Sequence, residues 1–499
     1  MGIGKTEGVK QMALFHFIWH NFTLFITLLL LTNLILAIVM ALFERRNPVT
    51  TMVWLMVIFF FPIIGFILYL FLGQDLRKRK LFILKAQEED KLIRTIRYQR
   101  TLLYGNQYKF KDPRVQNYTD MITLNLASSD APLSEDNTVK IYTTGEDKFA
   151  DLRTSIRNAR KFIHMEYYII RNDPLGREIV ELLAAKAREG VEVKFLYDGM
   201  GGIRLPKNFF DSLTQAGGKV AVFYPPFIPK FNLRVNYRNH RKICVFDGIE
   251  GYVGGFNIGT EYLGKSKRFN YWRDIHLKIE GSAVNELEFR FLLDWRFASE
   301  EENPFDDSYF PRHEPRGCTA VQVVSSGPDS KWPSIRNAYL KIINSARNHV
   351  YIETPYFVPD EEILSAMKMA ALSGVDIRVI IPQKPDHPFV HWAAMSYIGE
   401  LLESGVRFFA YHKGFIHSKM FTSDGFVSSI GTANLDIRSF RVNFEVNAFL
   451  YNEAAARELD EIFIKDMYDS TEITLEKYNQ RPLIAKTKDA ICRLLSPLL

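Results

Sequence analysis

The sequence is poor in cysteine and has no strong excess of either charge. Three cysteines, Cys244, Cys318 and Cys492, lie far apart and are odd in number. They form neither a disulfide framework nor the ligand spacing of a zinc site, which favours a reducing compartment. The net charge of +6 is mildly basic. It suits an anionic partner, such as nucleic acid or an acidic membrane surface, without deciding between them.

Charged residues are also missing from two long runs near the N-terminus. Residues 22–43 and 52–72 are almost wholly apolar, and each has the roughly 20 residues that a membrane helix needs. The first run is too long for the core of a signal peptide, and a second run follows at once. We therefore expect residues 1–73 to form a two-helix transmembrane hairpin. The alternative is a buried helical pair in a soluble core, where uncharged runs of this length are rare.

The basic residues beside these runs predict an orientation. Arg77–Lys80 follow the second run, and Lys5 and Lys10 precede the first. Because positive residues that flank a membrane span favour the cytoplasm, both ends of the hairpin are expected there. Arg45 and Arg46, in the turn between the two runs, argue against this orientation. The cluster at 77–80 can also bind acidic lipid headgroups or be a topology signal alone. Residues 74–110 are expected to form a basic, helical connector.

The rest of the chain contains an internal repeat. The matching segments are 159–166 with 346–353 and 190–195 with 374–379. Each copy alternates strand and helix, which predicts an α/β fold of two repeated halves, residues 111–305 and 306–499, with mostly parallel sheets. Packing about a pseudo-twofold axis would bring equivalent segments of the halves together in one active site.

Each half carries the pattern His-x-Lys-x4-Asp followed by Gly. The two sets are His240, Lys242 and Asp247, and His417, Lys419 and Asp424. Chance would give on the order of a few hundredths of such a match in this composition, so two copies are a strong signal. Each copy ends in Asp-Gly, which is typical of a hairpin. Because side chains alternate along a strand, the His and the Lys of each copy are expected on one face.

An imidazole beside an ammonium group suits chemistry on a phosphodiester. The ammonium stabilises charge on phosphate oxygens, and the imidazole can attack phosphorus or move a proton. Two such faces could supply a nucleophile and a general acid without a metal. The aspartates Asp247 and Asp424 have two readings, as catalytic groups or as turn residues that bind nearby backbone.

Equal spacing extends beyond the motifs. Asn257 and Asn434 each lie 17 residues after the motif histidine (257 − 240 and 434 − 417). They belong to glycine-led turns that include Gly255 in the first half and Thr432 in the second. We predict that these turns contact substrate phosphate, although a simple glycine turn with an Asn cap is the alternative.

A catalytic imidazole needs an acceptor on its second nitrogen. Asp274 and Glu445 lie in apolar, strand-like contexts where an unpaired carboxylate would be costly. We expect Asp274 to orient His240 and Glu445 to orient His417. Salt bridges to nearby arginines are the alternative.

Other polar residues are more ambiguous. His387 and His391 have the spacing of helical metal ligands, but Pro388 intervenes and no third ligand is evident. Asp386 is therefore expected to cap a helix. Glu166 and Glu353, at equivalent strand ends, could line the cleft or pair with arginine.

Taken together, the paired motifs resemble the phospholipase D superfamily. Further segments resemble its bacterial cardiolipin synthase branch: 45–48, 253–259, 353–359, 434–439 and 443–445. The resemblance implies that two phosphatidylglycerols give cardiolipin and glycerol through a phosphatidyl-histidine, with no cofactor or metal. It implies His240 as nucleophile and His417 as acid and then base. Lys242, Lys419 and the two asparagines would bind phosphate oxygens.

The expected partners are phosphatidylglycerol and anionic membrane lipids rather than nucleic acid. The expected location is the bacterial cell membrane, with several crossings and a cytoplasmic catalytic domain. Three alternatives remain open. A related lipid hydrolase, or a transferase using another alcohol or phosphatidylethanolamine, would share the same motifs. A nuclease would not need two membrane spans. A non-catalytic scaffold that binds acidic lipid would not need two intact motifs. The sequence gives no prediction of oligomeric state.

Overall fold

The computed structural model describes residues 20–39, 48–72, 89–225, 237–265, 268–299, 301 and 303–496. The described residues fall into two compact units, one up to Leu72 and one from Glu89 onward. The predicted turn at 44–47 and the basic run at 77–80 lie outside the described residues. We treat each unit separately.

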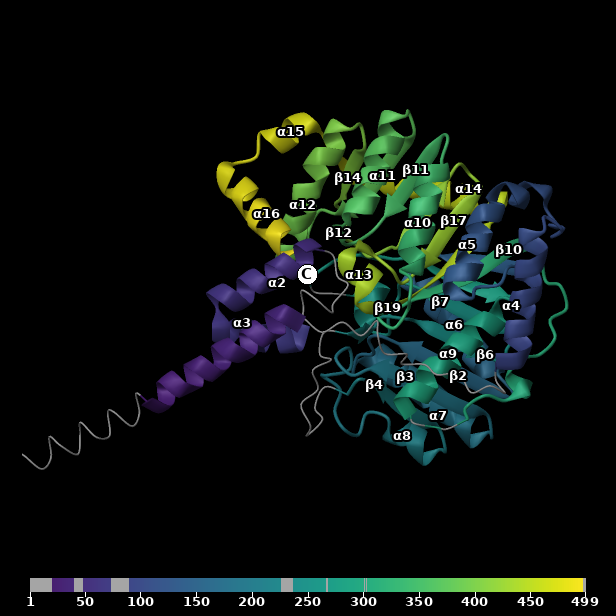
Figure 1. The fold of residues 1–499 in the computed structure, drawn as a ribbon. Coiled ribbons are helices and arrows are strands. Elements are labelled where there is room, and N and C mark those ends of the chain that lie inside the picture. Colours follow the sequence, from purple (N-terminus) through teal and green to yellow (C-terminus); the bar gives the residue numbers. More distant parts are fainter. Residues whose placement is uncertain are drawn as a thin grey trace, which may run out of the picture. The chain divides into compact units, whose positions relative to one another are not determined.

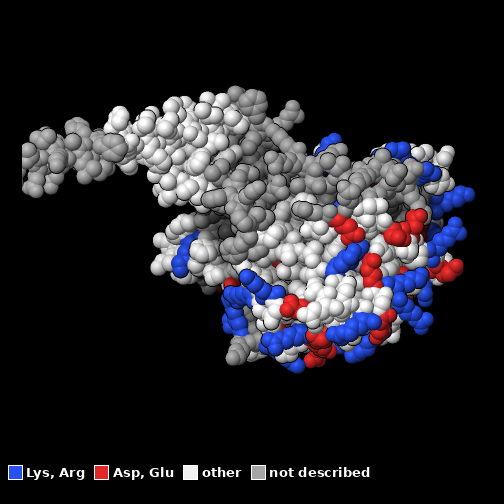
Figure 2. Space-filling view, turned by 90° about the horizontal axis from the view of Figure 1, so that it is seen from below, with Lys and Arg blue, Asp and Glu red and all other residues white. Residues whose placement is uncertain are grey.

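The N-terminal unit begins with a helix over His20–Val39, which is long and apolar enough to cross a membrane. Most of its side chains are exposed. Neither this helix nor the segment 48–72 contains Lys, Arg, Asp or Glu, whereas the visible surface of the larger unit carries both charge signs interspersed (Figure 2).

The second apolar run differs from the expectation of one continuous span. It forms two helices, α2 (Pro48–Phe60) and α3 (Pro62–Leu72), which turn back on each other (Figure 1). The rings of Trp54 and Tyr69 lie 5.6 Å apart, a contact that a straight helix would not allow across 15 residues. The break falls at Pro62, which has no N–H for the ladder of a continuing helix.

The larger unit is built on one sheet of sixteen strands. Fifteen of them follow one another in two sets of equivalent order, and the short β5 (Arg238–Asn239) lies off this path. The strands of the first half are β1 (Ser134–Tyr142), β2 (Phe162–Tyr167), β3 (Glu192–Asp198), β4 (Lys219–Phe223), β6 (Ile243–Phe246), β7 (Glu250–Gly254) and β9 (His276–Glu280). Those of the second half are β10 (Thr319–Ser326), β11 (His349–Glu353), β13 (Asp376–Pro382), β14 (Arg407–Tyr411), β16 (Met420–Ser423), β17 (Val427–Gly431), β19 (Asn443–Tyr451) and β20 (Ser470–Ile473).

The sheet is mixed, so the prediction of mostly parallel strands is wrong. In each half three strands are parallel, β2–β3–β4 and β11–β13–β14. The motif hairpins β6–β7 and β16–β17 then add antiparallel strands. The halves join where β1 pairs antiparallel with β10. The short motif hairpins explain the difference, because a tight turn can connect only antiparallel neighbours.

Helices cover both faces of this sheet. They are α4 (Glu89–Tyr104), α5 (Thr119–Ser129), α6 (Gly145–Asn158), α7 (Pro174–Arg188), α8 (Asp211–Gln215), α9 (Val284–Ser299), α10 (Ser334–Ser345), α11 (Glu361–Leu372), α12 (Pro388–Glu403), α13 (Ile437–Arg441), α14 (Glu453–Tyr468), α15 (Leu475–Asn479) and α16 (Leu483–Leu495), with 3-10 turns at η2 (Pro113–Tyr118), η3 (Thr260–Leu263) and η4 (Asp307–Tyr309). Helices α6 and α7 pack on the first half, and α10 to α12 on the second.

The core that lies under α9 and α14 contains residues from both halves. Leu287 and Phe291 of α9 share one apolar cluster with Leu459 and Phe463 of α14. Helices α4 and α5 come before strand β1 in the sequence, yet they pack in the core of the second half through residues such as Ile96 and Ile122. The two halves are therefore interleaved, and each depends on segments from the other.

Candidate active site

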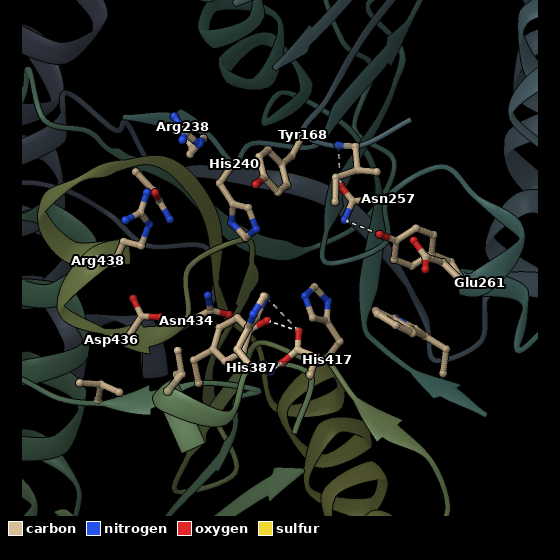
Figure 3. A pocket seen from close by; sticks show the side chains of 18 of the residues that line it. Tyr168, Arg238, His240, Asn257, Glu261, His387, His417, Asn434, Asp436 and Arg438 are labelled. Carbon is tan, nitrogen blue, oxygen red and sulfur yellow. Dashed lines mark hydrogen bonds and ion pairs between the residues drawn. The ribbon is translucent and has the colours of Figure 1, made fainter. Parts of the chain in front are cut away.

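A cavity of about 560 Å³ in the larger unit is lined by residues of both halves. His240 of the first motif and His417 of the second both line it (Figure 3). Asn257 and Asn434 also line it, as the equal spacing predicted. The structure thus brings together in one site four residues that lie up to 194 positions apart (434 − 240).

Each histidine is held by a carboxylate from the other half. Nδ1 of His240 hydrogen-bonds Oε2 of Glu445 at 2.9 Å, and Nδ1 of His417 hydrogen-bonds Oδ2 of Asp274 at 2.7 Å. The residue types were predicted correctly, but the expected pairing within each half, Asp274 with His240 and Glu445 with His417, is wrong. In both cases Nε2 is the nitrogen left for chemistry.

Strand pairing between the halves explains the crossed arrangement. The short strand β5 (Arg238–Asn239) pairs with β19 of the second half, and the backbone N–H of His240 donates to the carbonyl of Phe444 at 3.0 Å. In the same way β15 (Phe415–Ile416) pairs with β8 (Trp272–Arg273) of the first half. Each histidine therefore follows a strand that lies beside the carboxylate strand of the other half.

Burial keeps the two imidazoles in their neutral form. It lowers the pKa of His240 to about 4, with the charge of Lys242 acting in the same direction and Glu445 opposing it. Burial and the charge of Lys419 lower the pKa of His417. Although burial alone would raise the pKa of Glu445, its interaction with His240, including the hydrogen bond, and the charge of Lys242 lower it below its ordinary value. A neutral imidazole held at Nδ1 by a carboxylate is a competent nucleophile or base at Nε2.

The two lysines lie directly beside the histidines. Nζ of Lys242 donates to the carbonyl of His240 at 2.6 Å, and Nζ of Lys419 lies 3.2 Å from Nε2 of His417. Burial lowers the pKa of Lys242 to about 7 and that of Lys419 to about 8. Nζ of Lys419 thus lies at the ring of His417, whereas Nζ of Lys242 contacts the backbone of His240. Neither lysine is among the described residues that line the open cavity.

The motif aspartates bind backbone and do not reach the cavity. The carboxylate of Asp247 accepts N–H groups of Arg160, Lys161 and Phe162 at 2.7–2.9 Å. Asp424 accepts the equivalent three N–H groups of residues 347–349. The predicted catalytic role of these aspartates is therefore wrong. They act as turn residues that bind nearby backbone, which was the alternative interpretation.

Both aspartates also shape their hairpins. Asp247 and Asp424 have φ angles of 54° and 51°, a left-handed conformation that Asp tolerates better than most residues. Each carboxylate fastens its motif hairpin to the start of the neighbouring strand, β2 or β11. The aspartate of each motif thus supports the hairpin that follows the motif histidine.

Gly255 and Thr432 support the carboxylates instead of facing the cavity, so their assignment to phosphate binding is wrong. A Cβ on Gly255 would lie 1.9 Å from Oδ1 of Asp274, so only glycine allows this close approach. The carbonyl of Thr432 lies 3.1 Å from Nδ1 of His240. The side chain of Thr432 also lowers the pKa of Glu445 through a hydrogen bond.

The two asparagines differ in their contacts. Asn257 is engaged at both ends, since its oxygen accepts the N–H of Ile169 at 3.0 Å and its nitrogen donates to the hydroxyl of Tyr262 at 3.2 Å. The buried side-chain oxygen of Asn434 has no hydrogen-bond partner in the described protein. Asn434 is therefore the better placed of the two to contact a ligand.

Ion pairs beneath the site contain the glutamates that the sequence left open. Arg241 binds Asp294 through Nη1 at 2.5 and 2.7 Å, and Glu166 lies beside this pair. Arg273 of the first half binds Asp466 of the second at 2.6 Å. Glu353 beside it has its pKa raised to about 8, by burial and by Asp466. Neither Glu166 nor Glu353 is among the described cavity residues. Glu353 lies 4.0 Å from Nη2 of Arg273, which fits the predicted pairing with arginine, whereas Glu166 accepts a hydrogen bond from the side chain of Asn239.

His387 and His391, near the start of α12, had the spacing of helical metal ligands. Among the described residues, no group of three or more His, Cys, Asp or Glu could hold a metal ion. His387 lines the cavity and is itself the N-cap of α12, without a side-chain cap bond. The expectation that Asp386 caps this helix is therefore wrong. Its carboxylate instead accepts the hydroxyl of Tyr356 and the N–H of His387.

Several cavity residues were not predicted from the sequence, among them Tyr168, Arg238 and Arg438. Tyr168 stacks edge-on against His240, with ring centroids 5.0 Å apart. Arg238 and Arg438 line the cavity on the same side as His240 (Figure 3). A signal for Arg238 was available, because it lies two residues before His240 and strand alternation puts both on one face.

Comparisons with known proteins agree with the motifs. The family model described as "Cardiolipin synthase, PLD-like domain" matches residues 152–295 and 339–467. A second model, for a phospholipase D-nuclease N-terminal region, matches residues 33–74. The chain is 46% identical to a cardiolipin synthase of Listeria monocytogenes over 475 residues, covering 95% of this chain and 98% of the relative.

Further relatives include the major cardiolipin synthase ClsA of Bacillus subtilis, which is 44% identical over 96% of this chain and 99% of the relative. Among solved structures, the phosphatidylserine synthase of Haemophilus influenzae matches with a TM-score of 0.58 and 17% identity. It covers 78% of this chain and 100% of that one, and shares its fold. The chain belongs to the cardiolipin synthase family of phospholipase D-like proteins.

Proposed function

We propose that this protein is a phosphatidyltransferase that makes cardiolipin and glycerol from two phosphatidylglycerols, through a phosphatidyl group carried on His240. Its family and its relatives named cardiolipin synthase support the overall reaction. One observation carries the mechanism. Two histidines from different halves face one cavity, and each is bound at Nδ1 by a buried carboxylate.

In the first step, Nε2 of His240 attacks the phosphorus of one phosphatidylglycerol. The bond from phosphorus to the headgroup oxygen breaks, and His417 donates the proton that the departing glycerol needs. In the second step, His417 takes a proton from a headgroup hydroxyl of the second phosphatidylglycerol. That oxygen attacks phosphorus, the P–N bond to His240 breaks, and cardiolipin leaves. The bound anionic phosphate favours a protonated His417, which the free site disfavours.

The residues around the histidines would stabilise the phosphorane-like transition state. Lys242 lies against the backbone of His240 and Lys419 against the ring of His417, where low polarity would strengthen the effect of their ammonium groups on phosphate oxygens. Asn257 and Asn434 lie on the cavity wall. A pseudo-twofold arrangement of the halves would present equivalent groups on both sides of phosphorus.

The apolar N-terminal unit would hold the enzyme at its lipid substrates. Anchoring to the bilayer raises the effective concentration of the second lipid, which must compete with water for the intermediate. The catalytic unit is proposed to lie on the cytoplasmic face, because the basic run at 77–80 precedes it and such runs favour the cytoplasm.

The proposal is tested with full-length protein in vesicles of phosphatidylglycerol alone, with products identified by mass. We expect cardiolipin and glycerol in equal amounts. His240→Ala and His417→Ala should each lower the rate by about 10⁴-fold or more. Exposed Lys161→Met is the control and should behave as the wild type. Near-normal turnover in either histidine variant would contradict the mechanism, and phosphatidic acid as the main product would identify a hydrolase.

A further inference from the structure

The duplicated site is not symmetric at two positions beside the catalytic residues. Two residues before the motif histidine, the first half has Arg238 (240 − 2) and the second has Phe415 (417 − 2). Four residues after the asparagine that lies 17 positions beyond each motif histidine, the second half has Arg438 (434 + 4) and the first has Glu261 (257 + 4). Crossed pairing of the halves brings both arginines to the same side of the cavity.

The two arginines form one basic wall, hereafter the Arg238–Arg438 wall. Arg238 comes from β5 and Arg438 from α13, and both line the cavity next to His240 (Figure 3). Burial and the nearby charge of Arg238 lower the pKa of Arg438. The carboxylate of Asp436 also lines the cavity and acts on Arg438. Two guanidinium groups therefore share this wall with one carboxylate, and the remaining positive charge suits an anionic ligand.

The opposite side of the cavity has another character. Glu261 stands there and accepts a hydrogen bond from Arg171 at 3.1 Å. Phe415 is buried against Phe269 and Trp272, with ring centroids 4.7 and 5.0 Å away. Two further arginines, Arg171 and Arg268, also line the cavity, and Arg268 donates to backbone carbonyls at 3.0–3.1 Å. The His240 side therefore carries two guanidinium groups and one carboxylate, whereas the His417 side is aromatic and its Glu261 is already paired with Arg171.

Cardiolipin formation requires two phosphodiester anions in one cavity. The histidines and lysines hold the phosphorus that reacts. The phosphodiester of the second lipid keeps its charge and would be repelled by the first unless cations neutralise it. Paired guanidinium groups bind phosphate oxygens with two or more charge-assisted hydrogen bonds. We propose that the Arg238–Arg438 wall binds the phosphodiester of the acceptor phosphatidylglycerol, so that its free hydroxyl reaches the phosphorus on His240; this inference rests on the proposed function.

The test compares two acceptors in one assay. Phosphatidylglycerol vesicles with labelled free glycerol yield cardiolipin when a second lipid is the acceptor, and labelled phosphatidylglycerol when neutral glycerol is the acceptor. Because glycerol has no phosphate, it has no need of the wall. In Arg238→Gln/Arg438→Gln, the ratio of cardiolipin to labelled phosphatidylglycerol should fall about 30-fold or more, because the charge-assisted hydrogen bonds to the acceptor phosphodiester are lost. Arg238→Lys/Arg438→Lys should recover part of the ratio.

The matched control is Arg312→Gln/Arg316→Gln, which removes two charges from exposed positions and should leave the ratio unchanged. An unchanged ratio in Arg238→Gln/Arg438→Gln, with a melting temperature equal to the wild type, would overturn the inference whether or not the two rates fall together. A wild-type protein that makes neither product would count against the proposed function itself.

The N-terminal unit carries a second, independent inference about the membrane. Helices α2 and α3 have 13 and 11 residues, or about 20 and 17 Å, and neither spans a core of about 30 Å. They pack closely, because a Cβ on Gly65 would lie 2.5 Å from the carbonyl oxygen of Val57. The side chain of Asn33, in the helix His20–Val39, donates to the carbonyl of Pro62 at 3.0 Å.

These contacts fit a hairpin that enters the bilayer and leaves on the same face. Irregular backbone at membrane depth is tolerated where protein groups bind it, and Asn33 binds the turn between α2 and α3 from the longer helix. Charge agrees with this arrangement. A single crossing puts Lys5 and Lys10 on one side and the six basic residues at 45–46 and 77–80 on the other. With two crossings, Arg45 and Arg46 would lie on the side opposite to residues 77–80, against the preference of basic residues for the cytoplasm.

We infer that only the helix His20–Val39 crosses the bilayer, that α2 and α3 form a re-entrant hairpin, and that the N-terminus and the catalytic unit lie on opposite sides. The test labels Gly4→Cys in spheroplasts with a membrane-impermeant maleimide. The native exposed Cys318 of the catalytic unit serves as the internal control. We expect one of the two sites to react before permeabilisation and the other only after it. Reaction of both in the same condition would overturn this topology.

Discussion

Glu445 of the second half holds His240 of the first, with Oε2 at 2.9 Å from Nδ1. Asp274 of the first half holds His417 of the second in the same way. Neither half can therefore form a complete histidine–carboxylate pair alone. The crossing also means that a change in one half alters the histidine of the other, and the two carboxylates can be separated by experiment.

Glu445→Gln should impair the attack by His240. The amide can donate to Nδ1 and favours the tautomer that carries its proton on Nε2, so formation of the phosphatidyl-enzyme should fall about 10²–10⁴-fold. Asp274→Asn should instead impair proton transfer by His417. A phosphatidyl donor with a nitrophenyl leaving group needs no acid, so its burst in rapid-quench assays should survive in Asp274→Asn and be lost in Glu445→Gln. The opposite pattern would assign the carboxylates to the histidines within their own halves.

Asp247→Ala should destabilise the protein while leaving the chemistry intact. Its carboxylate accepts three backbone N–H groups at a left-handed φ of 54°, and we expect a loss of about 2–4 kcal/mol. Differential scanning calorimetry would show the lowered melting temperature, and turnover per folded molecule at low temperature should stay within a few-fold of the wild type.

Asp424→Ala is the matched variant in the second half and should lose a similar amount, because Asp424 makes the same three bonds. A turnover loss of 10³-fold or more in either variant, with an unchanged melting temperature, would restore the catalytic reading of the motif aspartates.

Lys148 should make stability depend on pH in a definite direction. It is fully buried, its Nζ donates to the hydroxyl of Tyr167 at 2.7 Å, and burial lowers its pKa from 10.5 to about 7. Between about pH 7 and 10.5 the unfolded chain therefore binds more protons at this site than the folded protein does. The buried amine lowers the free energy of unfolding most below pH 7, and this penalty shrinks as the pH rises.

Lys148→Met removes that titration. The melting temperature of the variant should exceed that of the wild type most at pH 7. This difference in melting temperature should shrink by about 5 °C by pH 9.5. Exposed Lys161→Met is the control and should show a constant difference. A melting-temperature difference for Lys148→Met that stays constant with pH would show that the buried amine does not titrate in this range.

The sequence predicted the parts of the site that depend on local pattern. The repeat gave two α/β halves, and the matched spacing of His240, His417 and the two asparagines placed all four on one cavity. The Asp-Gly signal gave the hairpin turns at Asp247. These features follow from neighbours along the chain, and strand alternation and turn chemistry are enough to predict them.

Features set by how segments dock could not be read in the same way. The pairing of β5 with β19 and of β15 with β8 depends on how the halves meet, so the crossed carboxylates were assigned to the wrong histidines. Likewise, hydropathy measures the length of an apolar run but not its bend, and the turn at Pro62 divided the expected second span. In the same way, Arg238 and Arg438 lie on one side of the cavity because of both the crossed pairing of the halves and the position of α13.

The central claim is that His240 carries the phosphatidyl group between two lipids, and the most direct test is to find it there. Full-length protein would be mixed with phosphatidylglycerol, quenched in milliseconds under conditions that preserve P–N bonds, digested, and examined by mass spectrometry. With phosphatidylglycerol labelled in its acyl chains, the account predicts a labelled phosphatidyl adduct on the peptide that contains His240, and this label is lost when excess unlabelled phosphatidylglycerol is added before the quench. An adduct on His417 with none on His240, or cardiolipin formation through no enzyme-bound phosphatidyl group, would contradict it.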